Sequence, residues 1–285
     1  MNYRHAFHAG NFADVAKHAL LARLILRLQA KETAFRFIDT HAGIGVYDLA
    51  GDESSRTLEW QSGIGRLLSV DLPPRIRELL APYLSAVRHA NGGGTALRYY
   101  PGSPALVRHL LRRQDRLTVV EMHPADAALL QARFAGDIQV KAIELDGWLA
   151  LPAFVPPKER RGLVFVDPPY EDRDDFDRLL AGFAKAHARW PTGVFALWYP
   201  MKDLSAVASF HARLAASGIP RIVRTEMAVR RPYAGGLFSG SGMILVNPPW
   251  QFDVEAAELL SGLAHLLALD SGAAARVDAI SGEKP

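Results

Sequence analysis

The sequence predicts a doubly wound α/β fold, in which a mostly parallel sheet carries helices on both faces. Apolar runs of strand length alternate with segments of helical periodicity over most of the 285 residues, which is typical of such sheets. The run Gly162 to Val166 is apolar throughout, as expected for a strand buried on both faces. Two late apolar runs, 221–229 and 241–246, have no helix between them, so we expect an antiparallel hairpin at one edge.

Composition limits the class of protein. With 49% hydrophobic residues, the chain can build a large core. It has no cysteine, which excludes disulfides and thiolate metal sites and permits a reducing compartment. The N-terminus carries charges where a signal peptide needs an apolar core, and no apolar run approaches the roughly 18 residues of a membrane span. We expect a soluble, cytoplasmic protein without membrane contact, and its formal charge of +3 is compatible with a polyanionic partner.

The first third of the chain departs from simple alternation, because two helical segments follow one another with no clear strand between them. We expect one domain over 1–285, with a helical insertion at 47–96 and a polar N-terminal arm at 1–10. The elements expected here are a helix at 11–29 with Asn11 as its N-cap, a strand at 35–39, a glycine-containing loop at 40–45, and helices at 54–68 and 74–90.

Regular alternation resumes after the glycines at 92–94. The expected helices are 103–113, 125–134, 174–189 and 204–217, and the expected strands are 117–121, 138–145, 162–167 and 193–199, followed by the hairpin. The tail after about residue 270 is expected to be loose.

The tetrapeptide Asp167-Pro168-Pro169-Tyr170 directly follows an apolar strand, so it projects from the carboxyl end of the sheet, where open α/β folds bind ligands. Its residue types suit chemistry on an exocyclic adenine nitrogen, whose lone pair is delocalised into the ring. A carboxylate and a prolyl carbonyl of fixed direction can accept the two N–H bonds and localise that lone pair. Tyr170 offers a stacking face for an extruded base, and Asp167 can receive the proton.

A second match, Asn247-Pro248-Pro249-Trp250, also follows an apolar strand. Its place in the chain argues against catalysis, because it lies after the hairpin, with only one helix and the tail remaining. Asp167, in contrast, is preceded by three strand ends that can build a cofactor pocket. We therefore interpret the second tetrapeptide as a structural turn.

Three strand ends before Asp167 are suited to hold S-adenosylmethionine. Gly43 and Gly45 let the backbone of the first loop approach a ligand, and His41 in that loop could meet the methionine end. Glu121 can accept both ribose hydroxyls and Asp146, followed by Gly147, can accept the adenine amino group. The histidine spacings fit no familiar zinc signature, so we expect no metal.

The chain resembles the bacterial 23S ribosomal RNA adenine-N6 methyltransferases designated by the letter J, in the segments YRHAFHAGN, DVAKH, DTHAGIG, RYYPGSP, EMHP, DPPY, ALWYP and NPPW. The resemblance implies a Rossmann-like class I methyltransferase with a small helical insertion, acting on naked or incompletely assembled 23S ribosomal RNA. We expect a monomer without a protein partner. It implies contact of Tyr3 with the RNA, and it implies cofactor contacts at His18, His41, Ser103, Glu121, Asp146, Gly147 and Asp167. Lys17 is expected either to face the pocket or to be solvated.

Several alternatives remain open at this stage. The same tetrapeptide suits a DNA adenine-N6 methyltransferase, although a 50-residue insertion offers little for reading a groove, and protein glutamine methylation uses a related motif. A nicotinamide dehydrogenase fits poorly, because the loop lacks the third glycine of its fingerprint. A non-enzymatic nucleic-acid-binding module would have lost some of the acidic residues. Four arginines, Arg221, Arg224, Arg230 and Arg231, are expected either to form part of an RNA track or simply to be solvated.

Overall fold

The protein is described by a computed structural model that covers residues 5–172, 174–231 and 238–282. Tyr3, the expected RNA contact, lies outside the described residues, as does the centre of the loop between the two hairpin strands. Within the described ranges, no helix combines the length and apolar character needed to cross a membrane.

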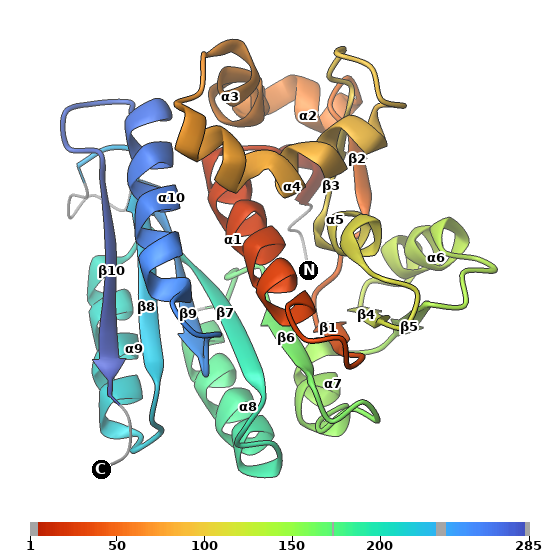
Figure 1. The fold of residues 1–285 in the computed structure, drawn as a ribbon, viewed down its shortest axis with the longest axis vertical. Coiled ribbons are helices and arrows are strands. Elements are labelled where there is room, and N and C mark those ends of the chain that lie inside the picture. Colours follow the sequence, from red (N-terminus) through yellow and green to blue (C-terminus); the bar gives the residue numbers. More distant parts are fainter. Residues whose placement is uncertain (1–4, 173, 232–237, 283–285) are drawn as a thin grey trace.

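The described residues form one eight-stranded sheet in the order β10-β8-β9-β7-β6-β1-β4-β5 (Figure 1). Five neighbouring strands are parallel, which confirms the predicted mostly parallel sheet. These are β7 (Val194–Met201), β6 (Gly162–Val166), β1 (Arg36–Asp39), β4 (Arg116–Glu121) and β5 (Val140–Glu144).

The topological switch point of this sheet lies at β1. The chain adds β4 and β5 on one side of β1 and β6 and β7 on the other, so the connections diverge there. Asp39, the last residue of β1, lies in register with Val119 of β4 and Phe165 of β6. Open α/β sheets bind ligands at the carboxyl ends of the strands beside such a point, and the functional residues predicted from the sequence belong to this edge.

The antiparallel part of the sheet differs from the prediction at its outer edge. The predicted hairpin is confirmed, because β8 (Ile222–Ala228) pairs antiparallel with β9 (Gly240–Val246). The hairpin is not the edge, however, and the tail after residue 270 is not loose: β10 (Ala274–Ser281) pairs antiparallel with β8. Val277 and Ile280 of this strand are only half-buried, which explains its weak apolar signal in the sequence.

Helices cover both faces of the sheet (Figure 1). One face carries α1 (Phe12–Gln29), α5 (Ser103–Leu110) and α10 (Phe252–Leu266), and α4 (Pro74–Ala90) packs on α1. The other face carries α7 (Gly147–Ala153), α8 (Asp175–Arg189) and α9 (Leu204–Ala216), while α6 (Pro124–Arg133) lies against β4 and β5. The short helix α7 was not predicted.

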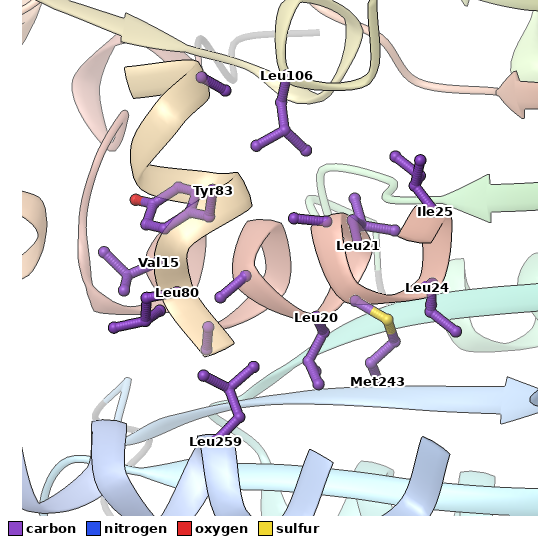
Figure 2. Packing of buried hydrophobic residues seen from close by; sticks show 14 of the residues in the cluster. Val15, Leu20, Leu21, Leu24, Ile25, Leu80, Tyr83, Leu106, Met243 and Leu259 are labelled. Carbon is purple, nitrogen blue, oxygen red and sulfur yellow. The ribbon is translucent and has the colours of Figure 1, made fainter. Parts of the chain in front are cut away.

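Helix α1 is the centre of the larger hydrophobic core. Its side chains meet α4 at Leu80 and Tyr83, α5 at Leu106, and the sheet at Met243 (Figure 2). Asn11 caps it as predicted, with its side-chain oxygen accepting from the backbone N–H groups of Ala13 and Asp14 at 2.9 and 3.0 Å. Because packing surrounds the first half of this helix, even its polar residues Asp14, Lys17 and His18 are buried, and this fixes their directions.

The segment between β1 and α5 is mainly helical, as expected, but its first helix is broken. It contains α2 (Asp52–Thr57), a π-helical turn (Gln61–Gly65), α3 (Arg66–Ser69) and α4, and it is flanked by the paired strands β2 (Val46–Asp48) and β3 (Tyr99–Pro101). Gly63 has non-helical dihedrals because its backbone passes against that of Gly10 and Asn11.

The N-terminal segment is bound to this helical segment by polar contacts. The Ser54 hydroxyl donates to the carbonyl of Ala6 at 2.7 Å, and Glu59 lies 3.1 Å from His8 Nδ1 and 2.9 Å from the Asn11 amide nitrogen that donates to it. Residues 6–11 are thereby held against the helical segment, and His5 just before them lines the cavity described below.

Candidate active site

A cavity of about 360 Å³ opens at the carboxyl edge of the sheet, beside the switch point. It is lined by residues from α1, the loop after β1, the start of α5 and the ends of β4, β5 and β6. The residues singled out from the sequence that line it include His18, His41, Ser103, Glu121, Asp146, Gly147, Asp167 and Pro168. The fold therefore brings together residues spread over 150 positions of the chain.

The loop after β1 is held by the buried carboxylate of Asp39, which is 0% exposed. Ser103 Oγ donates to Asp39 Oδ2 at 2.7 Å and the backbone N–H of His41 donates to Oδ1 at 3.2 Å. Burial raises the pKa of Asp39 to about 7, although both hydrogen bonds favour the charged form. Asp39 thus positions the ligand-facing loop and the first turn of α5.

Two glycines keep the cavity open where the backbone approaches closely. Gly43 has φ +60°, and a Cβ there would lie 2.1 Å from the Tyr47 hydroxyl. A Cβ on Gly147 would lie 2.2 Å from the carbonyl oxygen of Thr40 and 2.8 Å from His41 Nε2. A side chain at either position would fill or displace the wall of the cavity.

The acidic residues at the next two strand ends are held in fixed directions. Glu121 accepts the backbone N–H of Gly43 on Oε2 and that of His123 on Oε1, both at 2.8 Å. Asp146 Oδ1 accepts from the backbone N–H of Trp148 at 2.8 Å and so caps α7. Each carboxylate oxygen has a second lone pair for a ligand hydroxyl or amino group. This is the acceptor set that a ribose and an adenine require.

The centre of the cavity wall holds an ion-pair network that the sequence prediction did not resolve. Lys17 is 4% exposed, and its Nζ lies 2.6 Å from Asp167 Oδ2 and 2.8 Å from Asp14 Oδ1. Asp14 Oδ2 in turn lies 3.0 Å from His5 Nε2 and accepts the backbone N–H of Gly10 at 2.8 Å. The Lys17 ammonium also lies 4.9 Å from the centre of the Trp198 ring. Lys17 therefore faces the pocket and is not solvated.

These contacts set the charges around Asp167. Burial opposes the charge of Lys17, but Asp14 and Asp167 together raise its pKa above the usual value, so it remains an ammonium. Burial also raises the pKa of Asp167 above that of an ordinary aspartate, while Lys17 opposes the rise. Asp14 stays charged, because His5 and Lys17 outweigh its burial and hold its pKa well below the usual value. Asp14 and Lys17 are three positions apart and so lie on one face of α1, which is the one part of this network that the sequence could have indicated.

Tyr170 lies beside the cavity but is not among the described residues that line it. Its hydroxyl donates to the carbonyl of Trp198 at 2.6 Å, and its ring contacts those of Trp198 and Phe176 at centroid distances of 5.8 and 5.0 Å. The residue has φ +53° and is half-buried. The direction of the ring is fixed, and its expected stacking on a base stays a prediction.

The second tetrapeptide lies at the opposite end of the sheet from the cavity. Because β9 runs antiparallel to β7, the turn that follows Val246 emerges where the parallel strands begin. The Asn247 amide donates to the carbonyls of Pro191 and Gly193 at 2.8 and 2.9 Å, and Trp250 is 82% exposed. This geometry supports the structural interpretation of this turn.

The four arginines that were considered for an RNA track do not form one patch. Arg221 donates to the carbonyl of Pro248 at 3.1 Å, at the end of the sheet away from the cavity. Arg224 is paired with Asp278 of β10. The backbone N–H of Arg231 donates to Asp270 at 3.0 Å, and the Nε of Arg230 is buried. Arg221 and Arg224 thus make contacts within the antiparallel part of the sheet.

The residues present fit S-adenosylmethionine: successive strand ends supply acceptors for its adenosine, close-packed glycines leave room for it, and Asp167 stands at the switch point. Among the described residues no group of three or more histidine or acidic side chains could hold a metal ion. The sheet order, in which β9 is inserted antiparallel between β7 and β8 beside five parallel strands, together with this site defines a class I S-adenosylmethionine-dependent methyltransferase.

Comparison with known proteins narrows this class to a family. The family described as "RsmJ: Ribosomal RNA large subunit methyltransferase D, RlmJ" matches residues 32–280, and the chain belongs to it. Two proteins named ribosomal RNA large subunit methyltransferase J are similar to it. The one from Haemophilus influenzae is 41% identical and covers 94% of each chain. The one from Escherichia coli K12 is 40% identical and covers 92% of each chain.

One solved structure agrees with the fold over nearly the whole chain. The crystal structure of a Legionella pneumophila protein is 31% identical in sequence, covers 97% of this chain and 99% of its own, and has a TM-score of 0.87. The fold described above therefore matches that of a solved structure over nearly the whole chain.

Proposed function

We propose that this protein transfers the methyl group of S-adenosylmethionine to the exocyclic N6 of one adenine in 23S ribosomal RNA. The observation that carries the proposal is the Asp167 carboxylate, held by Lys17 in the wall of the cofactor cavity and followed by two prolines and a tyrosine. Membership of a family of ribosomal RNA large subunit methyltransferases supports RNA as the polymer.

The exocyclic nitrogen of adenine needs activation because its lone pair is conjugated with the ring. Lys17 binds Asp167 Oδ2, so Oδ1 and the carbonyl of Pro168 are the acceptors for the two N–H bonds. Both acceptors favour a pyramidal nitrogen whose lone pair points toward the methyl donor. When bound, S-adenosylmethionine supplies that methyl on a sulfonium.

Asp167 is also the acceptor for the proton that N6 loses. Its burial raises its pKa, which makes the carboxylate a better base than an exposed aspartate. The ammonium of Lys17 keeps the group ionised before reaction and holds its direction. Asp14 and His5 keep Lys17 in place from the opposite side.

The base must reach a carboxylate that is only 14% exposed, so the target adenine has to leave its stack. Paired bases in a finished subunit resist this extrusion, and we therefore propose naked or incompletely assembled 23S ribosomal RNA as the substrate. In this proposal the protein acts as a monomer in the cytoplasm, with Tyr3 and the helical segment 47–96 of its single domain beside the RNA.

The test offers three polymers to the enzyme with labelled S-adenosylmethionine: protein-free 23S RNA from cells that lack the activity, DNA from the same cells, and the cell's soluble protein. We expect label in the RNA, and much less in assembled large subunits. Label that enters only DNA or only protein would show that this other polymer, and not RNA, is the substrate. Asp167→Asn, which keeps the shape of the side chain, is the control for catalysis.

A further inference from the structure

Three buried polar groups form a chain that leads from the helical segment 47–96 to the cofactor cavity. The hydroxyl of Tyr83 on α4 lies 3.2 Å from that of Tyr100 on β3, and the Tyr100 hydroxyl lies 2.8 Å from Nδ1 of His18 on α1. Tyr83 and Tyr100 are 0% exposed and His18 is 1% exposed. His18 lines the cavity, whereas the two tyrosines do not.

The direction of the protons in this chain follows from counting donors and acceptors. If Tyr83 donates to Tyr100 and Tyr100 donates to His18 Nδ1, both hydroxyl protons are used. In the reverse direction, the Tyr83 proton would have no acceptor, because its hydroxyl has no second partner within the described part of the chain. A buried donor without an acceptor is unfavourable. The first direction is therefore the stable one, and Nδ1 is an acceptor.

The imidazole itself is neutral. Burial lowers the pKa of His18 to about 3, although the nearby Asp14 acts in the opposite sense. A neutral imidazole whose Nδ1 accepts a hydrogen bond carries its proton on Nε2. The Tyr100 ring stacks on that of His18, with an angle of 29° between the planes, so the imidazole cannot rotate freely. Nε2–H lies on the other side of the ring from the tyrosines.

The residues on the other walls of the cavity indicate which part of the cofactor lies next to the Nε2–H group of His18. Glu121 is the last residue of β4 and Asp146 follows β5, both on one side of β1, and their carboxylates are the acceptors for the ribose and the adenine. Asp167 stands where the methyl group is transferred. His41, which was also expected at the methionine end, packs against the start of α7 beside Asp146. His18 approaches from α1, on the side away from Glu121 and Asp146, which leaves it the methionine part. The carboxylate of that part only accepts hydrogen bonds, so it is attracted by Nε2–H and repelled by a bare Nε2 lone pair.

We propose that Tyr100, supported by Tyr83, is a positioning residue that fixes His18 as the Nε2–H tautomer, so that His18 donates to the carboxylate of the bound cofactor. The helical segment thereby contributes to cofactor binding through α4. The inference rests on the proposed function only for the identity of the cofactor and is independent of the polymer that is methylated.

Calorimetry with two ligands tests the proposal. S-adenosylhomocysteine carries the amino-acid carboxylate, whereas 5′-methylthioadenosine lacks the whole amino-acid part. We expect Tyr100→Phe to weaken binding of S-adenosylhomocysteine about tenfold and to leave binding of methylthioadenosine within about twofold, because only the first ligand meets Nε2–H. Tyr83→Phe should have a smaller effect in the same direction. The matched control is Tyr199→Phe, which removes a buried hydroxyl that contacts Glu226 and His211 elsewhere and should change neither affinity.

The tautomer itself is observable by NMR of protein with ¹⁵N-labelled histidine, with His18→Gln used to assign the signals. The wild type should show His18 protonated on Nε2 at neutral pH, and Tyr100→Phe should show a share of the Nδ1–H form. An Nδ1–H tautomer in the wild type would overturn the proposal, as would equal losses for both ligands in Tyr100→Phe. If that variant does not fold, the wild-type spectrum still decides. Neither measurement uses RNA, so a failure of this inference can be distinguished from a failure of the proposed methylation of RNA.

Discussion

At the scale of single residues, the site works because Lys17 connects two carboxylates with different tasks. Asp14 lies on the same helix and holds the ammonium, while Asp167 comes from the end of β6 and lines the cavity. The ammonium is buried, so its field acts on Asp167 with little screening by water. The pH dependence of catalysis should therefore depend on Lys17.

Lys17→Met should shift the acidic limb of the kcat–pH profile to higher pH. Burial raises the pKa of Asp167 and Lys17 lowers it, so removal of the ammonium lets the pKa rise further. The carboxylate that accepts from N6 in the proposed mechanism is then protonated at a higher pH, and kcat at the acidic end of the profile falls. Arg178→Met is the control, because Arg178 also lines the cavity but pairs with Asp172 and Asp175. An unchanged acidic limb in Lys17→Met would disprove this role.

Gly147→Ala should weaken binding of S-adenosylhomocysteine by at least about tenfold, a cost typical of overpacking. The new methyl group would lie 2.2 Å from the Thr40 carbonyl and 2.8 Å from His41 Nε2, so the loop that receives the cofactor must move. Gly94→Ala adds the same methyl at a position whose nearest neighbour is 3.6 Å away and should leave the affinity unchanged. Calorimetry measures both, and equal affinities for the two variants would contradict the close packing.

At the scale of elements, the direction of the strand before a tetrapeptide decides whether the tetrapeptide lies at the cavity or at the opposite end of the sheet. Both Pro-Pro turns follow apolar strands, but β6 is parallel to β1 and β9 is antiparallel to its neighbour β7. The two turns therefore emerge at opposite ends of the sheet. The residue pattern alone could not distinguish them, and the order of the strands could.

Asn247→Ala should reduce the free energy of unfolding by about 1–3 kcal/mol and leave kcat unchanged. The substitution removes two hydrogen bonds to the carbonyls of Pro191 and Gly193 and places alanine at φ +53°, which is unfavourable for it. Denaturant unfolding and methyl-transfer assays give the two values. A large loss of kcat in a folded Asn247→Ala protein would show that this turn belongs to catalysis after all.

Strand β10 should stabilise the molecule without contributing to the cofactor site. A chain that ends at Ala273 loses the pairing of β10 with β8 and the contact of Arg224 with Asp278. We expect a lower melting temperature and a tendency to aggregate through the uncovered edge of β8, with binding of S-adenosylhomocysteine retained at low temperature. A chain that ends at Gly282 is the control. Equal melting temperatures for both truncations would contradict a stabilising role for β10.

At the scale of the whole molecule, the sequence was most informative where an apolar strand is followed directly by a residue that can bind a ligand. The apolar strands and the acidic residues that follow them predicted the parallel sheet, and the fold brings the expected ligand-facing residues to one cavity. His18 and Ser103 were indicated only by the family resemblance, because a histidine on a helix and a serine in the first turn of a helix have no distinctive local pattern.

Features that depend on packing between distant segments were not predictable in the same way. The network of His5, Asp14 and Lys17 becomes visible only when α1 is placed against β6 and the N-terminal segment. Helix α7 is short and depends on the Asp146 cap. Strand β10 lies at the sheet edge with half-buried side chains, so its apolar signal is weak and it was mistaken for a loose tail.

Nucleoside analysis of methylated RNA decides whether Asp167 directs methylation of adenine N6. Protein-free 23S RNA from cells lacking the activity is incubated with labelled S-adenosylmethionine and either the wild type or Asp167→Asn, and is then digested to nucleosides. We expect the wild type to yield labelled N6-methyladenosine and Asp167→Asn, while still binding S-adenosylhomocysteine, to yield almost none. Label in another nucleoside, or equal label with both proteins, would contradict it.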